Sequence, residues 1–372
     1  MAGRSRSVRI AGAGTMGVAS ALELRARGWD VTLVEPGPLP RPEAASTDIS
    51  KIVRMDYGAD VLYTEMMEEA IPRWRAWSAR WGGGLFHEDG FLLLSRAPLS
   101  EGAFEGDSLA TLTARGHRLD RLDAAAIARR FPAWAQGGYV DGYLNPLAGW
   151  VESGRALGRM IDDARAAGVR FETGEGAAEG DVRLYAAGAW TPKVLPHLSS
   201  ALWAVAQPVF HLRPKDPEGW RPPAFTVWAA DIAATGWYGF PANADGIVKI
   251  AHHGPGRRVD PDAPRTIAPS DEDRLRAFLR ESLPGLAEAP LAHAKTCLYC
   301  DSFDGDFWIG EDQASPGRFV IAGDSGHGFK FAPVIGTVVA DVIEGKPNRF
   351  ASRFAPRTPA GRRAEDARFG LS

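Results

Sequence analysis

The chain has 372 residues, of which 45% are hydrophobic and 24% are charged, a composition that is ordinary for a globular enzyme. This length is sufficient for two domains or one large two-lobed body. The formal net charge of −3 gives no electrostatic basis for binding nucleic acid or an anionic membrane. We expect no signal peptide before the first strand, and no apolar run is long enough to cross a membrane. Two cysteines argue against a disulfide scaffold and favour a reducing, cytoplasmic setting.

Residues 8–35 predict a strand, a glycine-rich turn, a helix and a second strand, in that order. In this turn Gly12 allows a tight bend, Gly14 lets the backbone approach a pyrophosphate, and Gly17 lets the helix pack closely on the strand. The N-terminus of the helix offers N–H groups to the phosphates. Glu35 ends the second strand, where a carboxylate accepts ribose hydroxyls and disfavours a 2′-phosphate. The unit therefore predicts a site for an ADP-containing dinucleotide, without separating FAD from NAD.

The rest of the chain shows two kinds of pattern. Helical periodicity and buried-type apolar runs indicate α/β steps, whereas short alternating runs between residues 205 and 253 are typical of an antiparallel sheet. A turn at residues 88–90 predicts a β-hairpin over residues 85–95, and the basic tail from Pro356 predicts an exposed end. The expected helices cover 63–81, 122–131, 153–168, 271–283 and 335–343, and the expected α/β strands cover 169–171, 182–187 and 318–322.

The α/β pattern begins at the N-terminus and returns near the C-terminus, after the antiparallel region. A dinucleotide-binding domain interrupted in this way favours a flavoprotein over a simple NAD-dependent dehydrogenase. We therefore expect a two-lobed α/β fold with a discontinuous, Rossmann-like FAD-binding domain and an antiparallel-sheet substrate domain. The expected FAD-binding domain comprises residues 1–85, 150–204 and 310–372, and the expected substrate domain comprises residues 86–149 and 205–309.

Two further segments carry candidate functional residues. The turn GDSGHGFK, residues 323–330, is either a surface turn or a backbone cradle in which Lys330 reaches an anion. Lys249 lies on a mainly apolar strand, where alternation places it on one face with Ala251 and His253. Burial of such a lysine is costly unless it has a partner, whereas a lysine at a solvated edge is not costly. Both alternatives stay open from the residues alone.

Cys297 and Cys300 have the spacing of a redox disulfide, but no helix is predicted to begin there. A zinc site would need histidines such as His252, His253 or His293. Two small buried residues are the plainer interpretation. We favour this interpretation and expect no metal.

Together these segments resemble the covalent-flavin amine oxidases, the family of monomeric sarcosine oxidase, N-methyltryptophan oxidase, pipecolate oxidase and the fructosyl-amino-acid oxidases (amadoriases). The resemblance covers almost the whole chain. It rests on the N-terminal fingerprint with Glu35 and on six segments: STDISKIVRMDYG (46–58), AAGAWTPKVLP (186–196), YGFP (238–241), VKIAHH (248–253), TCLYCDSFDGDFWIG (296–310) and GDSGHGFKFAPVIG (323–336).

The resemblance implies FAD that is attached through a thioether from Cys297 to the flavin 8α-methyl group. It implies that Lys249 activates oxygen near flavin N5, and that Arg54 and Lys330 fix the substrate carboxylate. A buried carboxylate requires positive charge, and an arginine fork gives bidentate geometry. A cation near N5 stabilises the negative charge that forms as O₂ takes electrons. Tyr238 and His253 match pocket residues on the substrate side of the flavin, and Lys51 matches a residue near the flavin.

The chain also departs from the sarcosine oxidases. The sarcosine oxidases carry an arginine where this chain has Lys51, whereas the fructosyl-amine oxidases carry a lysine there. The turn that reads GDSGHGFK in this chain reads GFSGHGFK in the sarcosine oxidases. These departures favour an N-substituted amino acid bulkier than sarcosine. The connection over residues 173–181 is shorter than is usual in the family. The residues expected to contact FAD are Gly12, Gly14, Thr15, Met16, Gly17, Glu35, Ser46, Ser50, Lys51, Arg54, Ala187, Gly188, Trp190, Cys297, Gly326, His327, Gly328, Phe329 and Lys330.

We therefore expect an FAD-dependent oxidase of secondary-amine amino acids that carry an N-alkyl or fructosyl group. The resemblance implies hydride transfer from the C–N bond to flavin N5, hydrolysis of the imine, and reoxidation by O₂ to H₂O₂. The alternatives within the class are sarcosine or N-methyl amino acid oxidation, pipecolate-type imino acid oxidation and a pathway-specific step in secondary metabolism. An NAD-dependent dehydrogenase and a non-catalytic flavin-binding protein are the alternatives from other classes. The expected partners are a small amino-acid substrate and O₂, with no nucleic acid and no membrane, and we expect a monomer.

Overall fold

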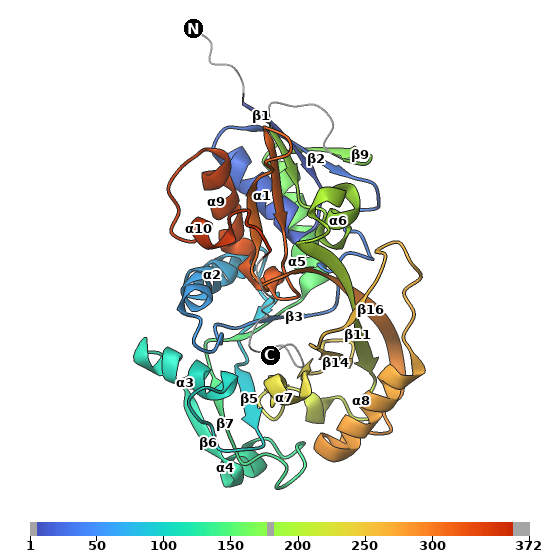
Figure 1. Cartoon of the computed structure of the whole chain (residues 1–372). Coiled ribbons are helices and arrows are strands. Elements are labelled where there is room, and N and C mark those ends of the chain that lie inside the picture. Colours follow the sequence, from blue (N-terminus) through green and yellow to red (C-terminus); the bar gives the residue numbers. More distant parts are fainter. Residues whose placement is uncertain (1–5, 177–181, 360–372) are drawn as a thin grey trace.

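Parallel strands that alternate with helices form the upper lobe in Figure 1. In the computed structural model, which describes residues 6–176 and 182–359, this lobe contains a six-stranded sheet whose pairings are all parallel except β17–β18. Its strands come from three distant stretches of the chain, as expected for a discontinuous dinucleotide-binding fold. In spatial order they are β17 (Trp308–Glu311), β18 (Arg318–Ala322), β10 (Val182–Tyr185), β1 (Ser7–Ala11), β2 (Asp30–Glu35) and β9 (Arg170–Thr173).

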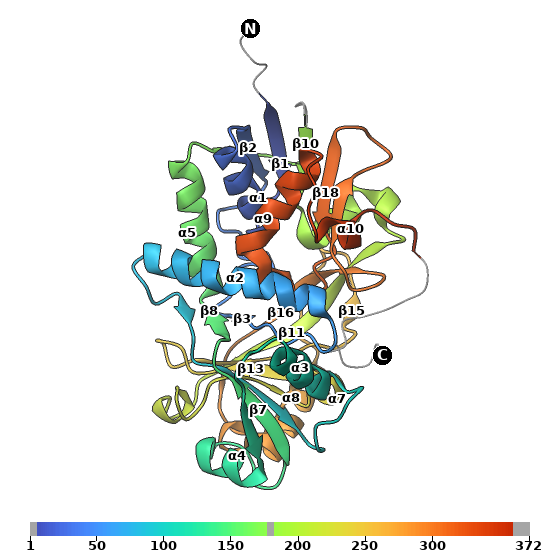
Figure 2. The same cartoon turned by 90° about the vertical axis from the view of Figure 1, so that its left-hand side faces the viewer.

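Helices cover this sheet and determine how closely its layers pack. Helix α1 (Thr15–Ala26) contacts both α5 (Ser153–Ala166) and α9 (Ala332–Ile343), and α2 (Val61–Arg80) crosses below them (Figure 2). The apolar residues of α5 recur at helical spacing and are buried, which explains why an amphipathic segment forms there. A Cβ atom at Gly336 would lie 2.3 Å from the Ala19 carbonyl oxygen, so the contact between α1 and α9 requires glycine.

A nine-stranded sheet forms the lower lobe, and its strands β11 and β16 extend upward to the other lobe (Figure 1). All its pairings are antiparallel except the parallel pair of β12 with β5, so the expected antiparallel sheet is in fact mixed. In spatial order the strands are β15 (Arg257–Arg258), β11 (Leu202–Leu212), β14 (Val248–His252), β13 (Trp237–Phe240), β12 (Val227–Ala230), β5 (Phe91–Ser95), β7 (Asp141–Asn145) and β6 (Asp120–Asp123), with β16 (Leu291–Ser302) paired to β11.

The hairpin expected over residues 85–95 is wrong. Strand β4 (Phe86–His87) pairs with β8 (Gly149–Val151) in a small sheet with β3 (Lys51–Val53), whereas β5 pairs with β7 and β12. The Glu88-Asp89-Gly90 turn therefore passes the chain from one sheet to another instead of reversing it within one. Strand pairing over more than 50 residues overrides the local turn signal, because burial of both strands decides it.

The remaining helices are short except for α8, and they lie at the edges of the two lobes. The other predicted helices and strands form within a few residues of their expected bounds, although the strand expected to reach residue 187 ends at Tyr185. No helix among the described residues is long and apolar enough to span a membrane. The remaining helices are α3 (Phe104–Ala114), α4 (Ala124–Arg130), α6 (Thr191–Val194), α7 (Ile232–Thr235), α8 (Pro269–Ser282) and α10 (Ala351–Phe354). The 3₁₀ turns are η1 (Gly188–Trp190), η2 (Pro196–Leu198), η3 (Glu218–Trp220), η4 (Pro284–Leu286) and η5 (Gly328–Phe331).

Three of the expectations reach beyond the described residues. The shortened connection over residues 173–181 lies partly there, as do the two outer ends of the expected FAD-binding domain. The tail expected to be exposed from Pro356 is described only as far as residue 359. Arg357 lies within that part and, contrary to the expectation, is not exposed. It donates to Asp304 through Nε and Nη2 and to the Phe307 carbonyl through Nη1. The division of the chain into two domains at the expected boundaries stays a prediction.

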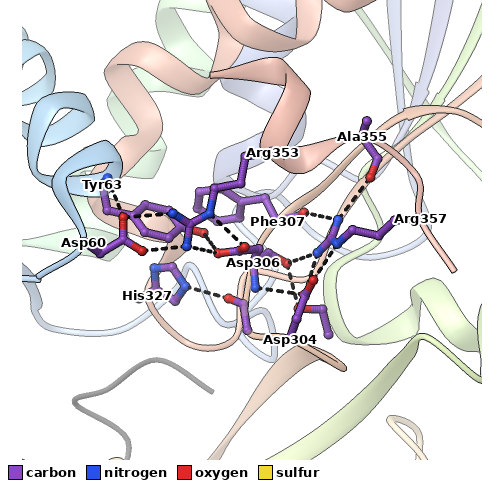
Figure 3. Close-up of polar contacts among 11 residues, drawn as sticks. Asp60, Tyr63, Asp304, Asp306, Phe307, His327, Arg353, Ala355 and Arg357 are labelled. Carbon is purple, nitrogen blue, oxygen red and sulfur yellow. Dashed lines mark hydrogen bonds and ion pairs between the residues drawn. The ribbon is translucent and has the colours of Figure 1, made fainter. Parts of the chain in front are cut away.

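Arg353 fixes the end of the described chain to the start of α2 (Figure 3). Its guanidinium donates to Asp60 at 2.9 Å and to both oxygens of Asp306 at 2.8 and 2.9 Å. Asp60 caps α2 by accepting from the Tyr63 backbone N–H, and the Tyr63 hydroxyl donates to Asp306 at 3.1 Å. One arginine therefore closes a network between two carboxylates that would otherwise lie close together with unbalanced charge.

Replacement Arg353→Met is expected to destabilise the protein by about 2 kcal/mol, because it leaves two partly buried carboxylates without their shared cation. Circular dichroism during heating measures the change as a lower Tm. Arg349→Met is the matched control, since Arg349 also bridges two acids, Glu65 and Glu69, but its side chain is 57% exposed against 25% for Arg353. The control is expected to cost less than about 0.5 kcal/mol. Equal losses of Tm in both variants would contradict the assigned role of Arg353.

Candidate functional site

A cavity of about 640 Å³ lies at the carboxyl ends of β1, β2, β10 and β18. This edge of a parallel sheet is where dinucleotides bind in doubly wound folds. The cavity thus lies where the glycine-rich turn predicted it. The predicted residues that line it are Gly12, Gly14, Thr15, Met16, Glu35, Ser46, Ala187, Gly188 and Trp190.

Two glycines of the turn are required by close backbone contacts. Gly12 has a φ of +107°, and a Cβ atom there would lie 2.4 Å from the Ala186 carbonyl oxygen. A Cβ atom at Gly17 would lie 1.9 Å from the Gly12 carbonyl oxygen, so Gly17 packs the helix on the turn and does not line the cavity. Gly14 does line the cavity, and a Cβ atom there would approach Ser46 Oγ to 3.3 Å. The turn therefore fits a dinucleotide pyrophosphate.

Glu35 is held at the cavity wall by its neighbours. Its Oε2 accepts from the Ala13 backbone N–H at 2.9 Å, and its Oε1 lies 3.4 Å from Nη1 of Arg41. Arg41 also lines the cavity and stacks over the Trp190 ring at 4.2 Å. Sequence reasoning missed Arg41, although a cation six residues after the ribose-binding acid is a usable signal for an anionic ligand.

A second, smaller cavity of about 60 Å³ collects positive charge among aromatic rings. The guanidinium of Arg54 and the ammonium of Lys330 both lie 5.0 Å from the centre of the Tyr57 ring. Lys330 donates to the Tyr57 hydroxyl at 2.7 Å and to the His327 carbonyl at 2.9 Å. The cavity residues are Lys51, Ile52, Arg54, Ala229, Ile232, Tyr238, Phe240, His253, Gly326, His327, Phe329 and Lys330.

One face of the lower sheet completes this cavity. Directly opposed residues of antiparallel strands project from the same face, and Tyr238 faces Ala251 while Phe240 faces Lys249. Lys249 and Ala251 in turn face His211 and Val209 of β11. Cys297 faces Gln207, two positions further along β11, so its thiol lies on this face as well. Lys249 and Ala251 therefore lie on one face of the sheet, as the alternation predicted, and Cys297 projects from the same face.

Cys297 lies between the two cavities. Its sulfur is 3.9 Å from Nζ of Lys51, which lines the smaller cavity, and its neighbour Leu298 lines the larger one. Cys300 is three residues away on the same strand and projects from the other face into a separate apolar cluster. The two thiols are unbonded and point apart, which argues against the redox disulfide.

Lys249 is buried in an ion pair, so it is not the solvated edge lysine of the alternative interpretation. Its Nζ lies 2.7 Å from Asp48, both side chains are 1% exposed, and it donates to the Ser50 carbonyl at 2.6 Å. Burial lowers the pKa of Lys249 to about 8, and the charge of Asp48 opposes that shift. Although burial opposes ionisation of Asp48, the nearby lysines and His211 hold its pKa well below its usual range. The pair is therefore ionic at neutral pH.

Some of the predicted site residues do not line either cavity. Lys249, Ser50, Cys297, Gly17 and Gly328 line neither cavity, and Gly328 instead gives room to Met16 and Asp324. Asp48 and Asp324 were not among the predicted site residues. Burial raises the pKa of Asp324, at the wall of the larger cavity, to about 6. A carboxylate such as Asp48 gives no signal in the sequence, because its partner Lys249 is 201 residues away.

Replacement Gly12→Ala is expected to remove most of the bound dinucleotide, because a methyl group cannot fit against the Ala186 carbonyl. Absorbance of the purified protein measures the retained cofactor. Gly28→Ala is the matched control, since Gly28 also has a positive φ, +86°, but nothing lies within 4 Å of the added methyl. The control is expected to keep its cofactor at a stability cost of about 1 kcal/mol. Retention of cofactor by Gly12→Ala would contradict the assigned role of Gly12.

Several known proteins are similar to this chain over nearly its whole length. Monomeric sarcosine oxidase from Bacillus sp. (strain B-0618) is 26% identical over 377 residues, which cover 95% of this chain and 96% of the relative. N-methyl-L-tryptophan oxidase from Salmonella heidelberg (strain SL476) is 28% identical over 368 residues, with 92% and 95% covered. The solved structure of Amadoriase I, a fructosyl amine:oxygen oxidoreductase from Aspergillus fumigatus, has a TM-score of 0.79 at 25% identity and covers 95% of this chain and 90% of its own.

A solved structure of a modified fructosyl peptide oxidase from Aspergillus nidulans has a TM-score of 0.84 at 20% identity, covers 99% of this chain and 97% of its own, and supports the fold. The family described as FAD dependent oxidoreductase matches residues 7–342. This match answers the choice between FAD and NAD that the turn left open. The larger cavity, with its required glycines and Glu35, lies at the sheet edge where dinucleotides bind in doubly wound folds. The chain therefore belongs to the FAD dependent oxidoreductase family.

Proposed function

We propose that this protein is an oxidase of secondary-amine amino acids, with O₂ as electron acceptor and H₂O₂ as product. The observation that carries the proposal is the small cavity lined by Lys51, Arg54 and Lys330 beside the dinucleotide cavity. Three cations gathered in a mainly aromatic and aliphatic enclosure favour an anionic ligand. The names of the relatives, which include sarcosine and N-methyl-L-tryptophan oxidases, support an amino-acid carboxylate as that anion. We further propose that the protein acts as a cytoplasmic monomer.

In this proposal Arg54 and Lys330 hold the substrate carboxylate. Arg54 is 6% exposed and Lys330 is 5% exposed, so their charges act in a medium that screens them poorly. Tyr57 lies against both cations, and its hydroxyl accepts from Lys330. Lys330 is therefore fixed in direction before a substrate arrives. Binding of the carboxylate orients the amine, and bound FAD supplies the redox chemistry by accepting electrons from the amine and returning them to O₂.

Size selects among the candidate substrates. The cavity has a volume of about 60 Å³, and its wall beyond the cations is formed by Ile52, Ala229, Ile232 and Phe240. No carboxylate is among the described residues that line it, so a sugar's hydroxyl groups would lack strong acceptors. In contrast to the bulkier substrate that the sequence departures favour, this lining favours a short apolar N-substituent or a cyclic imino acid over a fructosyl group.

A peroxide-coupled assay tests the proposed function. The panel is sarcosine, N-methyltryptophan, pipecolate, saccharopine, fructosyl-glycine and fructosyl-valine, with glycine and lysine as primary-amine controls. The expected result is peroxide release from at least one secondary amine and a preference for the smaller members. Absence of peroxide from all of the secondary amines, with FAD bound, would refute the proposed function.

We propose that FAD is attached covalently at Cys297, whose position between the cavities supports this assignment. Replacement Cys297→Ser is then expected to release essentially all of the flavin into the supernatant after acid precipitation, whereas the unaltered protein keeps it in the pellet. Cys300→Ser is the matched control and is expected to retain its flavin, because Cys300 projects from the other face of β16. Burial also raises the pKa of the Cys300 thiol, which keeps it unreactive. Acid-released flavin from the unaltered protein would contradict the covalent attachment.

Lys249 is proposed to stabilise the charge that forms on oxygen as O₂ is reduced. Replacement Lys249→Met is expected to slow reoxidation by O₂ at least about 100-fold, while reduction by substrate changes little. Stopped-flow absorbance measures the two half-reactions separately. Lys249→Arg keeps the cation and is expected to retain much more of the rate. An unchanged reoxidation rate in Lys249→Met would refute the role.

The pH dependence of reoxidation has a predicted sign as well. Burial lowers the pKa of Lys249 to about 8, so the cation is present below that pH and is lost as the pH rises through it. The reoxidation rate is therefore expected to fall above about pH 8 in the unaltered protein, and Lys249→Met is expected to lack this step.

A further inference from the structure

Four side chains form a row across the lower sheet, from the small cavity to the molecular surface. Phe240 of β13 faces Lys249 of β14, Lys249 faces His211 of β11, and His211 faces His293 of β16. Opposed residues of antiparallel strands lie on one face, so the row is continuous. The Lys249 ammonium lies 4.6 Å from the centre of the Phe240 ring, and the His211 and His293 rings are 5.6 Å apart. Phe240 lines the small cavity, and His293 is exposed.

Asp48 links the two inner members of this row. One carboxylate oxygen lies 2.7 Å from Nζ of Lys249, and the other lies 3.2 Å from Nε2 of His211. Lys295 lies 3.4 Å from the oxygen that His211 contacts. The carboxylate side chain is 1% exposed, so these side chains replace water as its partners. Lys249, Asp48 and His211 thus lie next to one another in space, each within contact distance of the next.

The outer end of the chain of contacts reaches solvent. A surface depression of about 410 Å³ is lined by His211 and His293 together with Ile49, Arg213 and Asp245, among other residues. His211 is therefore the member that contacts both this depression and the buried carboxylate. Its side chain is 8% exposed, and burial lowers its pKa while Asp48 opposes the shift. An imidazole that is neutral at pH 7 accepts a proton on one ring nitrogen and releases one from the other.

We infer that His211 and Asp48 form a proton route from the surface depression to Lys249. The inference rests on the proposed function. Reduction of O₂ to H₂O₂ takes two electrons and two protons, and removal of a hydride from a neutral amine supplies both electrons and one proton. The second proton passes from the Lys249 ammonium to the reduced oxygen. The proton on Nε2 of His211 then passes to Oδ1 of the Asp48 carboxylate, rotation of the protonated carboxyl group brings it to Nζ, and neutral Lys249 is recharged. A solvent proton binds the other ring nitrogen of His211.

This route solves a problem that the buried ion pair creates. A fixed cation stabilises charge on oxygen without losing a proton, but a lysine that donates its proton must be recharged for the next turnover. Lys249 is 1% exposed, and the described residues around it give it no direct contact with solvent. Asp48 raises the pKa of His211 and the charges of Lys249 and Lys295 lower it, while Arg213, Asp245 and His293 line the depression beside it.

The kinetic test uses the flavin-loaded protein. His211→Gln is expected to slow reoxidation by O₂ at least about tenfold, with an increased solvent deuterium isotope effect and with unchanged reduction by substrate. In His211→Ala, added imidazole is expected to restore part of the rate, because the surface depression admits it. His197→Gln is the matched control, since His197 also pairs with a buried aspartate, Asp312 at 2.8 Å, but does not line the surface depression. Equal reoxidation rates in His211→Gln and His197→Gln, or equal slowing of both half-reactions, would overturn the route.

A titration without turnover tests the contact itself. In protein labelled with ¹⁵N-histidine, NMR reports the pKa of His211. Removal of the nearby cation in Lys249→Met is expected to raise this pKa, and removal of the anion in Asp48→Asn is expected to lower it. Identical His211 titration in all three proteins would overturn the linkage even if peroxide were produced. Absence of peroxide from every amine would instead refute the proposed function, whatever the titration showed.

Discussion

Burial of charge is the constraint on which the site depends. Lys249, Arg54 and Lys330 lie inside the protein, where an isolated cation would be strongly destabilising. Each buried cation has a partner that stabilises its charge. Asp48 pairs with Lys249, and Tyr57 contacts the other two cations. Asp56 is also fully buried near Arg54, and it accepts hydrogen bonds from Tyr143 and Asn145. The segment from Asp48 to Tyr57 thus supplies Arg54 and partners for all three cations.

The discontinuous fold follows from the same requirement. A cofactor held at the edge of one sheet has to reach cations held by another sheet, so the two must be fixed rigidly to each other. The long paired strands β11 and β16 do this, because they extend between the lobes and pair along almost their whole length. Cys297 lies midway along this pair, next to the Leu298 that lines the dinucleotide cavity. A strand pair of this kind is harder to bend than a loop, and it holds the sulfur at a fixed distance from Lys51.

Local patterns could predict the dinucleotide turn and most helices, because Gly12, Gly17 and Glu35 act within one unit of about 30 residues. The same reasoning went wrong over residues 85–95, where the strands pair with β8 and β7. Strand β16 was not predicted, since its polar outer half, LAHAK, hides the alternation. The site residues Arg54, Lys330, Tyr238 and His253 were identified through family resemblance, and the structure places them around one cavity. Asp48 and His211 were missed, because only the fold brings them to Lys249.

The roles proposed for Lys249 place two conflicting demands on it, and its surroundings reconcile them. Stabilising charge on oxygen requires an ammonium that stays protonated, whereas delivering a proton requires one that gives it up readily. Burial alone would favour the neutral amine, and an ion pair alone would hold the proton tightly. Together they leave the pKa of Lys249 at about 8, close to neutral pH, where both protonation states are accessible. A general acid works best when its pKa lies near the working pH. Asp48 therefore does more than neutralise a buried charge, because it also adjusts how easily that charge moves.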